Sequence, residues 1–220
     1  MVDRSQFWSR AGAVGGIVFF VSLLVLIALM PLSHSKPEPA FDAPSSAFLA
    51  YEQSAAALPS ALALVGVLGL FGFAIFASVL TIRFRVAGNR SDVASALVLL
   101  AAGTFIVLWL AELGIGFAQT FRRADLDASS ASVLFGISNG VFVISWSAIA
   151  GFLVASGGAT LWTRALPAWL GWSAAVIGIA LFLASAVPLA PIWYLPYLLF
   201  FVWVLATSVA LLISTPQNHS

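Results

Sequence analysis

One carboxyl group stands alone among the apolar residues of this sequence. Glu112 is the only acidic or basic side chain within six long apolar runs. A charged side chain at the centre of a bilayer costs at least ~2.5 kcal/mol on insertion scales, so such a residue marks a candidate functional site by default. A carboxyl group in this position could carry a proton or a cation, contact a bound ligand, or hydrogen-bond to another helix.

Three other residues could share a site with Glu112. If the third apolar span ends near Ala118, Glu112 lies six residues, or ~9 Å, from that end. Asn139 lies ~10 Å into the next, antiparallel span, and so at a similar depth. We therefore expect Glu112 to hydrogen-bond to Asn139, with Ser138 as the alternative partner. Trp109, one helical turn before Glu112, either lines the same pocket or packs as an ordinary apolar side chain.

The sequence leaves the role of this pair open. A neutral glutamic acid can donate a hydrogen bond and lock two helices together, which is the structural interpretation. The carboxyl could instead be a proton or cation site in transport, or a polar contact to a bound ligand or lipid headgroup. Transport usually requires several polar groups along a path, and this chain offers few.

Residues for enzymatic or metal chemistry are scarce. The chain has no cysteine, which excludes disulfides, thiolate metal sites and cysteine nucleophiles. His34 and His219 lie outside the apolar runs, so no span supplies a haem ligand, and both read as solvated residues. Paired intramembrane acids and hydrolase motifs are also missing from the sequence. We expect no enzymatic activity, no cofactor and no metal.

Composition places the chain in a membrane. It is 62% hydrophobic and 8% charged, with a mean hydropathy of +1.08, whereas soluble domains carry about 25% charged residues. The net charge of +1 gives no electrostatic reason to expect nucleic acid as a partner. Each run reaches the ~20 residues that a helix needs to cross a hydrocarbon layer of about 30 Å. These observations predict one all-α domain over residues 1–220, a polytopic bundle with spans at about 11–30, 60–82, 95–118, 132–155, 167–187 and 192–214.

Basic residues near the span ends predict the orientation. With the N-terminus cytoplasmic, the inner side holds more Lys and Arg than the outer side, which is the usual bias. The inner set is Arg4, Arg10, Arg83, Arg85, Arg90 and Arg164, and the outer set is Lys36, Arg122 and Arg123. Aromatic residues that suit the interfaces agree: Trp8, Trp162, Trp169 and Trp172 inside, with Trp193, Tyr194 and Tyr197 outside. Both termini are therefore expected in the cytoplasm.

Two further segments have predicted structural roles. The outer loop 31–59 contains a stretch, 45–57, that favours a helix. This helix either lies in the membrane interface or prolongs the second span outward. Gly136 and Gly140 form a G-x-x-x-G spacing that lets another helix backbone approach closely, and small faces of the same kind occur at Gly66, Gly69, Gly72, Gly171 and Gly178.

Several of these segments together resemble a family of uncharacterised bacterial six-span membrane proteins, of the domain-of-unknown-function type. The likeness rests on Arg10-Ala11-Gly12 at the first span, a short helix around Tyr51, the stretch Gly136-Ile137-Ser138-Asn139-Gly140, and Arg164-Ala165-Leu166-Pro167-Ala168-Trp169-Leu170-Gly171-Trp172. It covers nearly the full length. Related sequences often carry an Asp ahead of the Asn of span four, and here that stretch reads Phe135-Gly136-Ile137-Ser138. The resemblance implies a bacterial plasma (inner) membrane location and no assigned activity.

The sequence therefore predicts a non-enzymatic, multi-pass bundle that binds a partner membrane protein or a lipid. An accessory subunit of a membrane complex is one form that this function can take. Its small-residue faces and sparse polar interior favour this function. The alternative is a small transporter, or a proton- or cation-coupled permease, that uses Glu112.

Overall fold

The protein is a bundle of long helices. The computed structural model describes residues 4–40, 42–55, 58–87, 92–187, 192 and 194–213. Within those ranges it contains seven α-helices, one 3-10 turn and no strand. They are α1 (Arg4–Leu29), η1 (Met30–Leu32), α2 (Ser45–Gln53), α3 (Leu58–Ala87), α4 (Asp92–Arg122), α5 (Ala128–Thr163), α6 (Ala168–Ser185) and α7 (Tyr194–Ile213).

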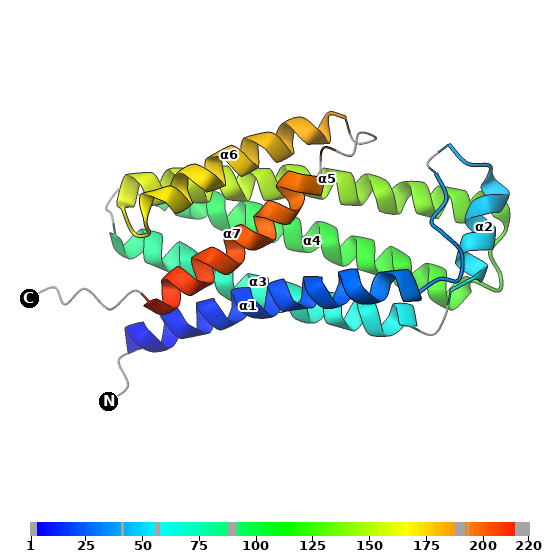
Figure 1. The fold of residues 1–220 in the computed structure, drawn as a ribbon, viewed down its shortest axis with the longest axis horizontal. Helices are drawn as coiled ribbons and strands as arrows, with labels where there is room; N and C mark the ends of the chain where they lie inside the picture. Colours follow the sequence, from blue (N-terminus) through cyan, green and yellow to red (C-terminus); the bar gives the residue numbers. More distant parts are fainter. Residues whose placement is uncertain are drawn as a thin grey trace, which may run out of the picture.

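All helices except α2 are long and apolar enough to cross a membrane, which confirms the predicted six-span, all-α bundle. The chain enters and leaves at the same end of the bundle (Figure 1). For α1, α3, α4 and α5 the apolar runs underestimate helix length, because residues beyond them stay helical, whereas α6 and α7 are each three residues shorter than their runs. α5 has 36 residues, or ~54 Å, whereas α6 has only 18, or ~27 Å. The long helices therefore extend well past the end of α6 toward α2 (Figure 1).

The short helix α2 lies across the end of the bundle that is opposite the termini (Figure 1). The chain turns at Ser54 and Ala55 before α3 begins at Leu58. Ser35 N–H donates to the Ser54 carbonyl at 3.2 Å, which ties the preceding loop to this turn. The segment is thus a separate helix and does not prolong α3. The last two residues of the predicted stretch, 56–57, lie outside the described residues.

Glycine brings two pairs of helices into backbone contact. A Cβ built on Gly15 of α1 would lie 2.5 Å from the Gly72 carbonyl oxygen of α3, and the reverse distance is also 2.5 Å. In the same way a Cβ on Gly157 of α5 would lie 2.7 Å from the Gly171 carbonyl oxygen of α6. Without an aqueous driving force between helices, such close packing is the main source of association in a membrane.

Phenylalanine fills the centre of the bundle. Aromatic rings from five helices meet there, with neighbouring centroids 4.9–6.4 Å apart, mostly edge to face. The central members are Phe19, Phe73, Phe105, Phe152 and Phe200, each buried. Trp203 of α7 lies beside them and donates from Nε1 to the Leu170 carbonyl at 2.9 Å, which links α7 to the start of α6.

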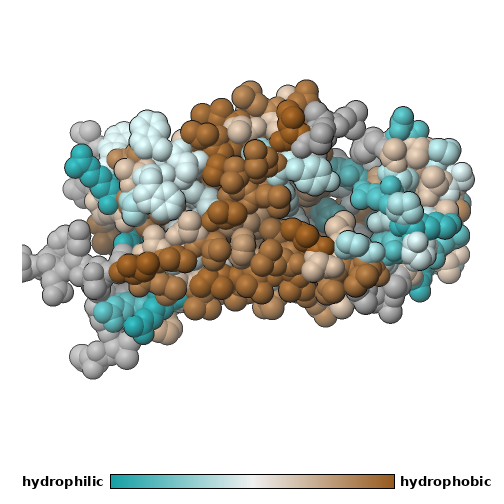
Figure 2. Space-filling model, viewed as in Figure 1, coloured by the Kyte–Doolittle hydropathy of each residue, from teal (hydrophilic) through white to brown (hydrophobic). Residues whose placement is uncertain are grey.

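The surface carries an apolar band between two more polar ends (Figure 2). Trp8, Trp162, Trp169 and Trp172 are exposed near the end that holds the termini, as expected of interface residues. Tyr194 is exposed as well, but Tyr197 is buried against Phe142 and Phe201. The predicted interface role of Tyr197 is therefore wrong, because the first turn of α7 directs this side chain into the core. Trp193 lies outside the described residues.

Candidate functional site

Glu112 lies between α4 and α5 and is half-buried. The Ser138 hydroxyl donates to Glu112 Oε1 at 2.9 Å. Ser138, the alternative partner in the sequence prediction, is thus the residue that the structure brings to Glu112. Asn139 instead donates from Nδ2 to the Phe135 carbonyl of its own helix at 3.0 Å. The expected bond between Glu112 and Asn139 is wrong, because successive residues of a helix point about 100° apart and only Ser138 faces α4.

Trp109, one helical turn before Glu112, packs in a cluster of aromatic rings. Its ring meets Phe105 at 6.0 Å and Phe142 at 6.3 Å, in both cases edge to face. Phe142 in turn meets Tyr197 of α7 at 5.6 Å. The Trp109 Nε1–H is buried and has no hydrogen-bond partner among the described residues. A buried donor without a partner costs free energy, so this indole is a group that an acceptor placed beside it would stabilise.

The chemical capacity of the site is narrow. It combines one carboxyl, one hydroxyl and one free indole N–H. No group of three His, Cys, Asp or Glu residues that could hold a metal ion occurs within the described ranges. The arrangement can hold a proton, accept a hydrogen bond or contact a cation.

The register between α5 and α6 gives an estimate of the depth of Glu112 in a membrane. The contacts of Gly171 with Gly157 and of Gly178 with Ala150 set the register between α6 and α5. In that register the exposed Trp172 lies opposite about residue 156 of α5. A hydrocarbon layer of ~30 Å that begins there spans about 20 residues and ends close to Gly136. A layer placed in this way would put Ser138 and Glu112 near its boundary on the α2 side, where a polar group costs less than at the centre.

Apolar packing closes the bundle on the other side of Glu112. Along α4 toward the termini end, the inward positions Phe105, Ala102 and Val98 are each at most 1% exposed. The next polar side chain on that face is Ser95, which is fully buried. A proton or ion that reached Glu112 would meet an apolar layer several turns thick on this face of α4, with no described ionisable side chain in it.

Gly136 and Gly140 face away from the other described helices. A Cβ built on either would meet no atom of the described residues within 4 Å. The predicted packing of this G-x-x-x-G pair is therefore wrong within the chain. In contrast, Gly69, Gly72, Gly171 and Gly178 do receive close neighbours. Gly157 of the same helix contacts α6, but α6 stops before it reaches the part of α5 that holds Gly136 and Gly140 (Figure 1).

A second polar cluster lies at the α2 end, and the sequence prediction missed it. Gln119 of α4 donates from Nε2 to Glu52 Oε1 of α2 at 3.2 Å, and both side chains are buried. Burial raises the pKa of the Glu52 carboxyl above its ordinary value. The available signal was the spacing of Phe48 and Glu52, four residues apart on one face of α2. Phe48 packs on Phe135 at 4.7 Å, so the same face also carries Glu52 against the bundle.

His34 belongs to this cluster too. Its ring stacks on Tyr51 at 3.9 Å, and Nδ1 lies 2.9 Å from the Ser33 hydroxyl. The interpretation of His34 as a solvated loop residue is therefore wrong, and burial lowers the pKa of its imidazole. Arg123 donates to the Ala55 carbonyl and so fastens the same turn to the end of α4. The cluster holds α2 in place, while His219 lies outside the described residues.

Comparisons with models of known protein families, with curated proteins and with solved structures find no match. The site is therefore interpreted from its own geometry.

Proposed function

We propose that this protein is a non-enzymatic, multi-pass membrane protein that binds a transmembrane helix of another membrane protein, as an accessory subunit. One observation carries this proposal: the open face of α5 around Gly136 and Gly140. The predicted bacterial inner membrane location and cytoplasmic termini are part of the proposal.

The open face continues the side of α5 that packs on α6. A Cβ built on Gly178 of α6 would lie 3.0 Å from the side chain of Val154 in α5. Gly136 lies 18 residues, or five full turns, before Val154 and therefore on the same side of α5. α6 ends at Ser185, opposite about residue 143 of α5. Beyond that level no described helix covers Gly136 or Gly140.

The chemistry of this face suits a helix from another chain. Two glycines four residues apart let a second backbone approach closely, as they do elsewhere in this bundle. The exposed side chains of Val133, Ile137 and Ile144 provide an apolar rim beside the glycines. Because the layer estimated above ends near Gly136, a spanning helix could reach both glycines while it stays within the membrane.

The experiment that tests this proposal uses the absence of cysteine in the chain. A single cysteine at Ile137, treated in native membranes with a short cysteine-to-lysine or photoactivated cross-linker, is expected to give one adduct heavier than the protein. The adduct should disappear when Gly136 is also changed to Leu, whose side chain would fill the approach. Val176→Cys, on an exposed position of α6, is the control and should give no discrete adduct.

Two results would overturn the proposal. An adduct of twice the mass of this chain would mean that the open face joins two copies and not a different protein. The same cross-linked adducts from Ile137→Cys and Val176→Cys would mean that the face has no specific partner. So would adducts of Ile137→Cys that persist when Gly136 is changed to Leu.

Proton or cation transport is the second candidate, and one observation favours it. Glu112 is bonded only through Oε1 among the described residues, so Oε2 is available. The apolar layer of Phe105, Ala102 and Val98 argues against a path through the bundle. Flux into liposomes that wild type supports and Glu112→Gln abolishes would make transport the function and displace the accessory-subunit proposal.

A further inference from the structure

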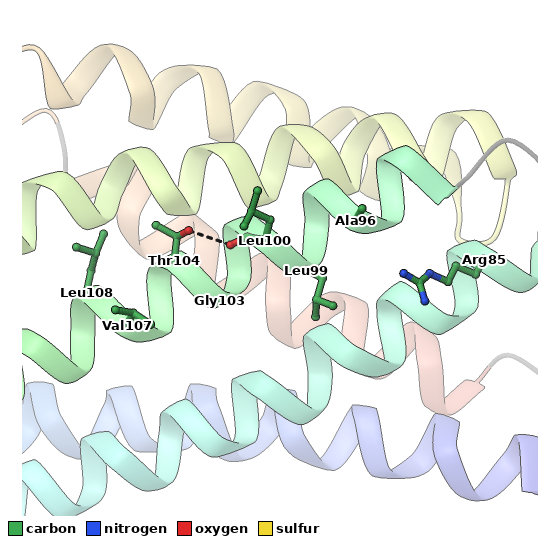
Figure 3. Close-up of a pocket in the computed structure, with 8 residues that line it drawn as sticks. All are labelled: Arg85, Ala96, Leu99, Leu100, Gly103, Thr104, Val107 and Leu108. Atoms are coloured by element: carbon green, nitrogen blue, oxygen red, sulfur yellow. Dashed lines mark hydrogen bonds between the residues drawn. The ribbon is translucent and has the colours of Figure 1, made fainter.

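A groove runs along the outer surface of α4 on the side of α3. Its volume is about 650 Å³, within the range of about 300–1,000 Å³ that is usual for small-molecule sites. The close-up in Figure 3 shows that α4 supplies the wall, with Arg85 reaching in from α3. The lining residues are Arg85, Ala96, Leu99, Leu100, Gly103, Thr104, Val107 and Leu108.

This groove is an apolar trough with one cation. Thr104 is the other polar lining residue, and its hydroxyl donates to the Leu100 carbonyl of its own helix at 2.9 Å. Arg85 is exposed and makes no hydrogen bond or ion pair with any described residue. Arg83, two residues earlier, differs because it donates to the Ala165 carbonyl at 3.0 Å. No group of the described residues therefore occupies the guanidinium of Arg85, and it can bind an anionic group in the groove.

The groove has the length of a lipid chain. From Ala96 to Leu108 it extends ~18 Å along α4, compared with about 15 Å for one leaflet of hydrocarbon. An extended acyl chain of this length can lie along it.

Arg85 lies at the level of a headgroup. Gly66 of α3 lies opposite Leu113 of α4, which places Arg85 opposite about residue 94 of α4. The bond from Ser138 to Glu112 carries this register to α5, where the level is about residue 156, the level of the interface residue Trp172. The cation therefore meets the polar layer and the groove descends from it into hydrocarbon.

We propose that the groove binds an anionic phospholipid. The phosphate is paired with Arg85, and one acyl chain lies along Leu99, Gly103 and Val107. A guanidinium binds phosphate oxygens through two parallel N–H donors. An anionic lipid is favoured over a zwitterionic one because choline or ethanolamine would bring a second cation next to Arg85 and partly neutralise the phosphate.

Native mass spectrometry of the purified full chain tests this site with phosphatidylglycerol and phosphatidylcholine as probes. We expect wild type to retain phosphatidylglycerol in preference to phosphatidylcholine. Arg85→Gln should lower that preference about fivefold, the factor that one cationic contact with an anionic surface provides. Arg85→Lys, which keeps the cation, should retain most of it. Arg164→Gln removes the same charge at the same end, outside the groove, and should leave the preference unchanged.

A second variant tests the trough independently of charge. A Cβ on Gly103 meets no described atom within 4 Å, so Gly103→Leu fills the groove without disturbing the bundle. It should reduce retention of both lipids, whereas Gly158→Leu, the same change at an open position of α5, should not. Equal preference in wild type and Arg85→Gln, an equal effect of Arg164→Gln, or full retention in Gly103→Leu would each overturn the proposal.

Discussion

The contact between α1 and α3 gives the sharpest prediction about stability. In Gly15→Ala the new Cβ would lie 2.5 Å from the Gly72 carbonyl oxygen, whereas ordinary contacts begin at 3.4 Å. The obstacle is backbone, which cannot rotate away, so α1 must move outward by about 1 Å. A gap of 0.5–1 Å loses about a quarter to a half of the dispersion energy of each contact across it. Overpacking of this kind typically costs about 1–3 kcal/mol.

Gly103→Ala is the matched control for this change. It makes the same substitution within a long helix but places the Cβ in open space. Both variants gain the same helix propensity, about 1 kcal/mol, so this term cancels when they are compared. The difference in the free energy of unfolding between the two variants should therefore be about 1–3 kcal/mol, with Gly15→Ala the less stable.

The assay is unfolding in mixed micelles by titration with sodium dodecyl sulfate, followed by tryptophan fluorescence. Gly103→Ala should unfold at the same denaturant fraction as wild type or a higher one, and Gly15→Ala at a clearly lower fraction than Gly103→Ala. Two variants that unfold within about 0.5 kcal/mol of each other would refute the reasoning, because the backbone contact would then not hold the helices at this distance.

Three further predictions concern single side chains. Trp203→Phe removes one of two side-chain donors to the Leu170 carbonyl and should lower the free energy of unfolding by about 0.5–1.5 kcal/mol, measured in the same titration. The pKa of Glu52 is raised by burial, so the folded state binds its proton more tightly than the unfolded state, and stability falls as pH rises above 4.5 through the folded pKa. Glu52→Gln should therefore raise the melting temperature at pH 7 and weaken this part of the pH dependence; no change at pH 7 would contradict the assignment. Ser138→Ala should lower the free energy of unfolding by about 0.6 kcal/mol, the average for hydrogen bonds between membrane helices. Glu112→Gln should lower it by less, because the amide oxygen can still accept the bond from Ser138.

The bundle could be predicted from the sequence because lipid imposes a strong constraint. A spanning segment must satisfy its backbone internally, so long apolar runs become helices and their number sets the fold. Helix ends could not be predicted equally well. Gln119 and the serines at the start of α5 are polar, yet they continue their helices into a layer where side chains can be hydrated or paired. The hydropathy pattern detects the hydrocarbon layer and not the end of the helix.

The sequence predicted which helices hold the candidate site and at what depth, but not which residue hydrogen-bonds to Glu112. Depth follows from rise per residue, which brought Glu112 to the level of both Ser138 and Asn139. Which of the two faces Glu112 depends on the rotation of α5 about its axis, and this is fixed by distant contacts such as Gly157 with Gly171. The open face at Gly136 has the same origin, because it depends on where α6 ends.

The central claim is that the open glycine face of α5 receives a helix of another protein. The most direct measurement is the native mass of the protein released from its own membranes into lipid nanodiscs, for wild type and for the double variant Gly136→Leu, Gly140→Leu. The account predicts a complex with a second, different chain in wild type and its loss in the double variant, while Gly158→Leu retains it. A wild-type mass that corresponds to this chain alone, or a complex that survives the double variant, would contradict the claim.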